Sequence, residues 1–132
     1  MSFSIDGKTV IVTGAANGIG AALARHFAEN DANVMCADID EKALKKDLGE
    51  SADDSNVRYF AGDLREKLTL ANLLSATVDA FDRVDVLVNA SRQMATTDPL
   101  DMDDETVEKL LQQNLMTSLR LSQMVAKRMI KQ

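Results

Sequence analysis

The chain has 132 residues, of which 45% are apolar, and this length and composition suit a single globular domain. The formal net charge of −6 argues against nucleic acid or an anionic membrane surface as a partner, and no apolar run is long enough to span a membrane. The only cysteine, Cys36, and the only histidine, His26, provide neither a disulfide framework nor a set of metal ligands, so we expect a cytoplasmic protein without a metal site.

Short apolar runs alternate with segments of helical character along the chain. The expected strands are residues 9–12, 33–37, 57–61 and 84–88. The expected helices are residues 21–30, 41–49, 70–81 and 107–132. A loop over 89–100 holds the only proline, Pro99, and the acidic stretch from Asp98 to Glu105 is expected to start a solvated helix. This alternation over residues 1–132 predicts one α/β domain with a doubly wound parallel sheet.

The most informative stretch is TGAANGIG at residues 13–20, between the first expected strand and the first expected helix. Glycines let the chain turn tightly and allow a ligand to approach the backbone closely. The helix that follows offers unpaired N–H groups and a partial positive charge at its N-terminus. A strand, a glycine turn and a helix in this order therefore indicate a binding site for the pyrophosphate of a dinucleotide.

Asp38 ends the second expected strand, beside the end of the first. A carboxylate there can accept hydrogen bonds from both hydroxyls of the adenosine ribose, and it would repel a 2′-phosphate. Because no Lys or Arg lies between Gly14 and Gly20 to offset that repulsion, the sequence favours NAD over NADP. The alternative for Asp38 is a solvated carboxylate at a strand end. Asp40 lies two residues beyond the strand and is expected to cap the next helix.

The glycine motif and right-handed crossovers predict a Rossmann-type sheet with strand order 3-2-1-4. Ligands should then bind over the C-terminal ends of strands one and four. Both faces of strand 84–88 are apolar, as in a central strand that is covered on both sides, yet this order places it at the sheet edge. We therefore expect a longer gene product, a homo-oligomer or a complementing chain to cover strand four.

These residues resemble the classical NAD-dependent branch of the short-chain dehydrogenase/reductase family over essentially the whole chain. Residues 13–20 match its TGxxxGIG motif without a mismatch. The resemblance implies that Asp38 holds the adenosine ribose, that Ile39 lies against the adenine and that Asp63 accepts a hydrogen bond from the adenine amino group. For Asp63 the alternative is a turn residue at a strand end. The cofactor-binding residues implied in this way are Gly14, Asn17, Gly18, Ile19, Gly20, Asp38, Ile39, Asp63, Leu64, Asn89, Ala90 and Ser91.

Strand four departs from the family pattern where it should end in NNAG, because this chain has NASR at 89–92. Without a gap, Arg92 stands where a glycine normally lies beneath the cofactor. With a shift of one residue, Ser91 replaces that glycine. In either case a side chain enters a place that is usually clear, and Arg92 would swing out or contact a phosphate or an acidic substrate.

Asn114 matches the asparagine at the family's fourth catalytic position. The resemblance implies that it helps to hold a water that links the catalytic lysine to solvent. An asparagine on the inward face of a helix can divert backbone hydrogen bonds and admit a water. The alternative is a polar residue that is satisfied within the core.

The resemblance stops before the catalytic groups of the family, a serine and a Tyr-x-x-x-Lys pair. The only tyrosine, Tyr59, is followed four residues later by Asp63, and Ser91 is in the wrong place for the catalytic serine. Family members are about twice this length. We expect the N-terminal, cofactor-binding half of an NAD-dependent oxidoreductase that interconverts alcohols and carbonyl compounds, truncated after about four strands. The alternative is a non-catalytic NAD-binding module.

Overall fold

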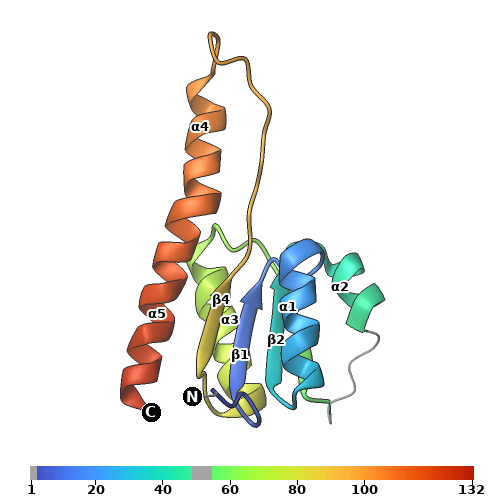
Figure 1. Cartoon of the computed structure of the whole chain (residues 1–132). Helices are drawn as coiled ribbons and strands as arrows, with labels where there is room; N and C mark the ends of the chain where they lie inside the picture. Colours follow the sequence, from blue (N-terminus) through green and yellow to red (C-terminus); the bar gives the residue numbers. More distant parts are fainter. Residues whose placement is uncertain (1–2, 49–54) are drawn as a thin grey trace.

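Four parallel strands form a central sheet with helices on both of its faces (Figure 1). The computed structural model describes residues 3–48 and 55–132. The strands are β1 (Thr9–Thr13), β2 (Asn33–Asp38), β3 (Val57–Ala61) and β4 (Val86–Asn89). Their order, β3-β2-β1-β4, confirms the predicted Rossmann-type topology. The order reverses between β1 and β4, which is where such sheets bind their ligands.

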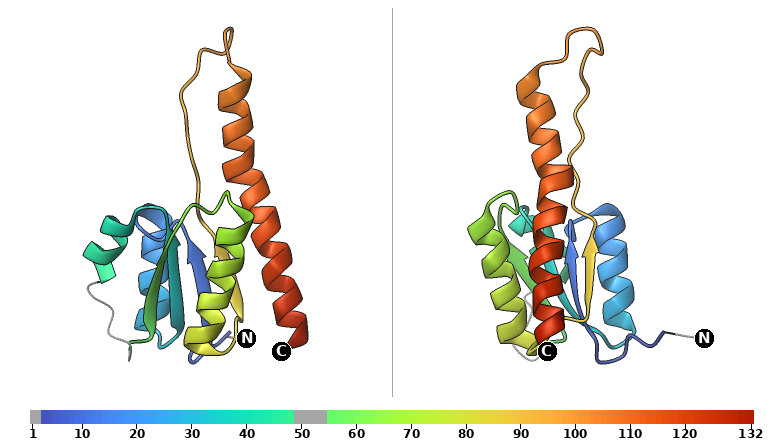
Figure 2. Two further views of the ribbon diagram at one scale, coloured as in Figure 1. Left: turned by 180° about the vertical axis from the view of Figure 1, so that it is seen from behind. Right: turned by 90° about the vertical axis from the view of Figure 1, so that its left-hand side faces the viewer.

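Helices pack on the two faces of the sheet in pairs. The helices are α1 (Gly18–Glu29), α2 (Glu41–Leu48), α3 (Lys67–Phe81), α4 (Asp104–Leu111) and α5 (Thr117–Lys131), with a π-helical turn, η1 (Gln112–Met116), between the last two. Apolar residues of α1 and α2 form one core with the sheet, and those of α3 and α5 form another on the opposite face (Figure 2).

The alternation of side chains along β1 explains the two cores. Val10 and Val12 pack with the residues of α1, while Ile11 packs with those of α3 and α5, because successive side chains of a strand point to opposite faces. All three are fully buried. The continuous apolar run in the sequence is therefore the consequence of a strand that is covered on both faces.

The last helical region extends well beyond the sheet, and the segment between β4 and α4 runs alongside it (Figure 1). The carboxylate of Asp103 caps α4, since it accepts hydrogen bonds from the N–H of Thr106 at 2.8 Å and from its hydroxyl at 2.9 Å. The expected acidic start of a helix is thus confirmed. The expected single helix is interrupted by η1, where the hydroxyl of Thr117 donates to the carbonyl of Gln112 at 3.0 Å.

Several boundaries differ from those predicted. Helix α1 begins at Gly18 because the glycine turn itself forms the first helical turn. Strand β4 begins at Val86, since the backbone of Val84 is hydrogen-bonded to the side-chain amide of Gln132 instead of a neighbouring strand. Gly49, the expected end of the second helix, lies outside the described residues.

Within residues 3–48 and 55–132, no helix has the length and apolar character needed to cross a membrane.

Candidate cofactor site

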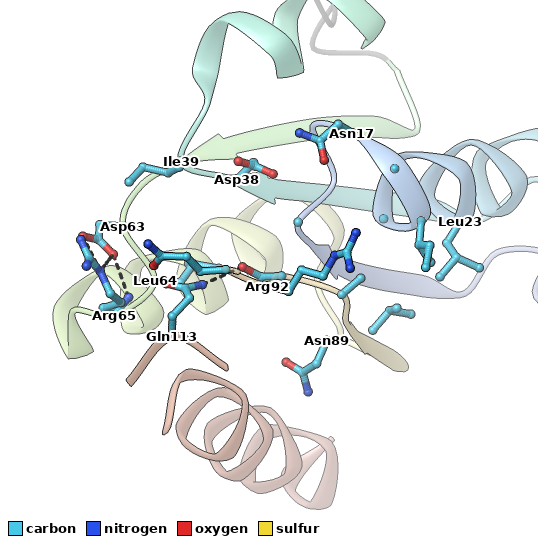
Figure 3. Close-up of a pocket in the computed structure, with 18 of the residues that line it drawn as sticks. Asn17, Leu23, Asp38, Ile39, Asp63, Leu64, Arg65, Asn89, Arg92 and Gln113 are labelled. Carbon is cyan, nitrogen blue, oxygen red and sulfur yellow. Dashed lines mark hydrogen bonds and ion pairs between the residues drawn. The ribbon is translucent and has the colours of Figure 1, made fainter. Parts of the chain in front are cut away.

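A cleft of about 700 Å³ lies over the C-terminal ends of the strands (Figure 3). It is bordered by the glycine turn and by the residues that follow β2, β3 and β4, and η1 contributes Gln113. The cleft brings together every residue that the sequence predicts for cofactor binding: Gly14, Asn17, Gly18, Ile19, Gly20, Asp38, Ile39, Asp63, Leu64, Asn89, Ala90 and Ser91.

The glycines of the turn have two different structural roles. Gly14 has φ +66°, and a Cβ there would lie 2.7 Å from the carbonyl oxygen of Ala90. A Cβ on Gly20 would collide with the carbonyl of Gly14. Gly18 has φ +57°, but a Cβ there would meet nothing within 4 Å. Gly14 and Gly20 therefore allow the turn to pack, whereas Gly18 leaves open space above the backbone for a ligand.

The N-terminus of α1 borders this open space. Asn17 precedes the helix in an extended conformation, its side chain makes no capping hydrogen bond, and the first turn contains no acidic residue. The first backbone bond of the helix runs from the N–H of Ala21 to the carbonyl of Asn17. The N–H groups before Ala21 precede any acceptor within the helix, so they can bind an anion that enters the cleft.

Asp38 is held at the edge of the cleft by two backbone groups. Its Oδ2 accepts a hydrogen bond from the N–H of Ala16 at 3.1 Å, and its Oδ1 accepts one from the N–H of Asp40 at 3.0 Å. Each carboxylate oxygen keeps a second lone pair that can accept a hydroxyl. Asp40 does cap α2, since its Oδ1 accepts from the N–H of Ala43 at 3.0 Å. Ile39 is 67% exposed beside these residues.

Asp63 has a partner that the sequence interpretation missed. Arg65 binds its carboxylate through two nitrogens, with Nη2 2.7 Å from Oδ2 and Nε 3.0 Å from Oδ1. These hydrogen bonds hold the pKa of Asp63 below its usual value, against the opposing effect of burial. An adenine amino group at this place would share the carboxylate with Arg65. The signal in the sequence was the Asp-x-Arg spacing.

The end of β4 is held against β1 by Thr13. The Oγ1 of Thr13 accepts hydrogen bonds from the N–H groups of Ala90 and Ser91, both at 3.2 Å. The hydroxyl of Ser91 accepts a hydrogen bond from Nε2 of Gln113 at 2.9 Å. Asn89 donates from Nδ2 to the hydroxyl of Ser122 at 3.0 Å. These contacts fix the backbone that forms the floor of the cleft.

Asn114 does not line the cleft itself. It is exposed, so the alternative of a residue satisfied within the core is wrong. Its Oδ1 accepts from the N–H of Gln93 at 2.8 Å, and its Nδ2 donates to the carbonyl of Gln93 at 2.9 Å. The side chain thus fastens the loop after β4 to η1. Its part in a water relay stays a prediction.

Cys36 is buried in β2, and burial raises the pKa of its thiol to about 12. The thiol is therefore neutral near pH 7 and acts as a small apolar side chain, as the sequence predicts. In the described part of the chain, no group of three or more His, Cys, Asp or Glu side chains is placed to hold a metal ion.

Comparison with known proteins connects these features to one family. Residues 8–132 match the sequence model of the short chain dehydrogenases. The chain is 33% identical to an uncharacterized oxidoreductase of Thermotoga maritima and 34% identical to D-threitol dehydrogenase of Mycolicibacterium smegmatis. It is 29% identical to NAD-dependent glycerol dehydrogenase of Listeria innocua. These alignments cover 96%, 97% and 97% of this chain and 50% of each relative, so the chain spans about half the length of these curated proteins.

Proposed function

This chain belongs to the short-chain dehydrogenase family, and we propose that it supplies the NAD-binding part of an oxidoreductase. The reaction would interconvert a small alcohol and its carbonyl compound, with transfer of a hydride to or from the nicotinamide. One observation carries the proposal. The uncapped N-terminus of α1, the open space above Gly18 and the carboxylate of Asp38 all border the same cleft.

The described residues fit such a dinucleotide in three places. The first turn of α1 would bind the pyrophosphate through backbone N–H groups. The carboxylate of Asp38 would accept the ribose hydroxyls, and Ile39 would cover one face of the adenine. Together these contacts orient the cofactor over the ends of β1 and β4, and the bound dinucleotide then supplies the hydride chemistry.

The preference for NAD over NADP rests on the charge of Asp38. A 2′-phosphate would lie close to this carboxylate, and two like charges 4 Å apart repel by about 1 kcal/mol in water and about 4 kcal/mol near a protein surface. The relative from Listeria innocua, which is named as NAD-dependent, supports the same choice.

Proton transfer would need groups that are not among these 132 residues. The only tyrosine, Tyr59, is in β3 with Lys45 Nζ 5.8 Å from its ring centre, and it does not line the cleft. We propose that a longer gene product or a complementing chain supplies the rest of the active site, and that this part or a second copy covers β4. The exposed leucines Leu111, Leu115 and Leu119 support such a partner. A second candidate function, NAD binding without turnover, is favoured by the absence of a Tyr-x-x-x-Lys sequence.

The test is calorimetric titration of the purified protein with NAD and NADP, comparing Asp38→Asn with Asp40→Asn. Both changes remove one carboxylate with little change in shape, and only Asp38 lines the cleft. We expect Asp38→Asn to weaken NAD binding about tenfold, because a charged acceptor is lost, and to narrow the preference over NADP. Asp40→Asn should leave the affinity for NAD and the preference over NADP unchanged. An unaltered ratio of the two affinities in Asp38→Asn would refute the assigned role.

A further inference from the structure

We infer that Arg92 is a phosphate-binding residue of the cleft, whose guanidinium contacts the pyrophosphate of the bound dinucleotide. This inference rests on the proposed function and adds to it a residue at the position where the chain departs from the family pattern. Arg92 lies three residues after the end of β4 and lines the cleft. Figure 3 shows its side chain directed from the end of β4 across the cleft toward the side on which α1 begins.

The hydrogen bonds of its two neighbours fix the point from which the Arg92 side chain starts. Before it, Ser91 is held through its N–H by Thr13 and through its hydroxyl by Gln113. After it, both backbone groups of Gln93 are bound by the amide of Asn114. The backbone of Arg92 is therefore held between β1 on one side and η1 on the other. Because this backbone is already held, none of its conformational entropy has to be lost when the guanidinium binds an anion.

The charges around the cleft single out this guanidinium. Two arginines line the cleft, and Arg65 is bound through two nitrogens by Asp63. The contact of Arg92 is from Nη1 to the sulfur of Met94, at 3.6 Å, and a thioether is a weak acceptor. In the part of the chain that the structure describes, no carboxylate forms an ion pair with Arg92. The planar, five-donor guanidinium is suited to binding a phosphate through two hydrogen bonds.

The position of Arg92 indicates that it would contact the pyrophosphate of the dinucleotide and not the adenosine. Asp38 and Asp63 follow β2 and β3, so the adenosine would lie on that side of the cleft. Arg92 comes from the other side of β1, at the end of β4. The pyrophosphate would cross the start of α1 between these two sides, where the helix N-terminus and a cation act on the same anion. Arg92 would thereby add to a backbone site a charged contact from the opposite wall.

The experiment compares Arg92→Gln, Arg92→Lys and the control Lys127→Gln, which removes one charge from an exposed position on α5. Affinities of the purified protein for NAD, ADP and adenosine are measured at one ionic strength, and NAD is then titrated at increasing salt. We expect Arg92→Gln to weaken NAD and ADP about tenfold and to leave adenosine unchanged, since only the first two carry the anion. The affinities of Arg92→Lys for NAD and ADP should lie between those of Arg92→Gln and the unaltered protein, and Lys127→Gln should bind all three ligands as the unaltered protein does.

The salt titration provides a second readout that a purely structural role would not change. Loss of a phosphate contact should make NAD binding by Arg92→Gln less sensitive to salt than that of the unaltered protein. Equal affinities for NAD and ADP before and after Arg92→Gln would overturn the inference and leave the proposed function standing. A loss that is as large for adenosine would also overturn it, since Arg92 would then only shape the turn. Failure of the unaltered protein to bind either NAD or ADP would overturn the proposed function as well.

Discussion

The region around β1 and α1 and the region around β4 and α5 differ in how completely they are covered. Every residue of β1 is buried, whereas no residue of β4 is fully buried. Helix α5 buries Leu121 and Val125 against the sheet and α3, but it leaves Leu119 47% exposed. The strand of the first region is covered on both faces, and this region supplies the glycine turn and the start of α1 to the cleft. The second retains apolar surface, which is typical of a face that meets another part of a protein.

The shape of the cleft does not depend on the parts of β4 and α5 that are less completely covered. The glycine turn packs against β4 through Ala90, and Asp38 is held by the backbone of Ala16, so the shape of the cleft depends on contacts within the described residues. The cover of β4 and α5 would have to come from residues outside them.

The largest effect on stability is expected from two leucines of α5 that differ in burial. Leu121→Ala is expected to lower the free energy of unfolding by about 2–5 kcal/mol, because it leaves a cavity in a closed core. Leu119→Ala, on the same helix, should cost less than about 0.5 kcal/mol at low protein concentration. Urea denaturation at low and high protein concentration measures both. If a second copy covers Leu119, the loss of unfolding free energy in Leu119→Ala will increase with protein concentration. Equal losses for Leu119→Ala and Leu121→Ala at low concentration would contradict the difference in burial.

A smaller effect should separate two glycines that share one backbone conformation. Gly14 and Gly7 have φ of +66° and +68°, but a Cβ would collide with Ala90 only at Gly14. Gly7→Ala is expected to lower the free energy of unfolding by about 1 kcal/mol, because alanine disfavours the left-handed conformation. Gly14→Ala should cost at least about 1 kcal/mol more, since the backbone of β4 must move, and it should also weaken NAD binding. Similar unfolding midpoints for the two variants would show that the turn does not depend on this close packing.

The smallest effect concerns the ion pair at the edge of the cleft. The hydrogen bonds from Arg65 hold the pKa of Asp63 below its usual value, so the pair stabilises the folded protein above about pH 4 and loses this contribution as the pH falls through the lowered pKa. Arg65→Gln should cost less than about 1 kcal/mol at pH 7 and should make stability below pH 4 less dependent on pH. The measurements are urea denaturation at several pH values and an NMR titration of the Asp63 carboxyl, with Lys127→Gln as control. A carboxyl that titrates at the same pH in both proteins would argue against the ion pair in solution.

Much of the cofactor cleft follows from local features of the sequence. The apolar runs, the TGAANGIG turn and the polar residues at strand ends determined the strand order and identified cleft residues such as Gly18 and Asp38. Their positions are set by elements next to them in the chain, since a strand, a tight turn and a helix leave little choice for the residues between them. Leu23 could have been added, because it lies one helical turn after Gly20 on the side that lines the cleft.

Other features were decided only by the tertiary structure. Gln113 of η1 reaches the cleft and binds Ser91, whereas its neighbour Asn114 binds the backbone of Gln93 in the loop after β4. The two neighbours of Arg92 are held from distant parts of the sequence, because Ser91 is bound by Thr13 and Gln93 by Asn114. Local patterns determine which segments form strands and helices, because backbone sterics and hydrogen bonding act over a few residues. The pairing of distant side chains depends on how the segments pack, and packing is a property of the whole fold.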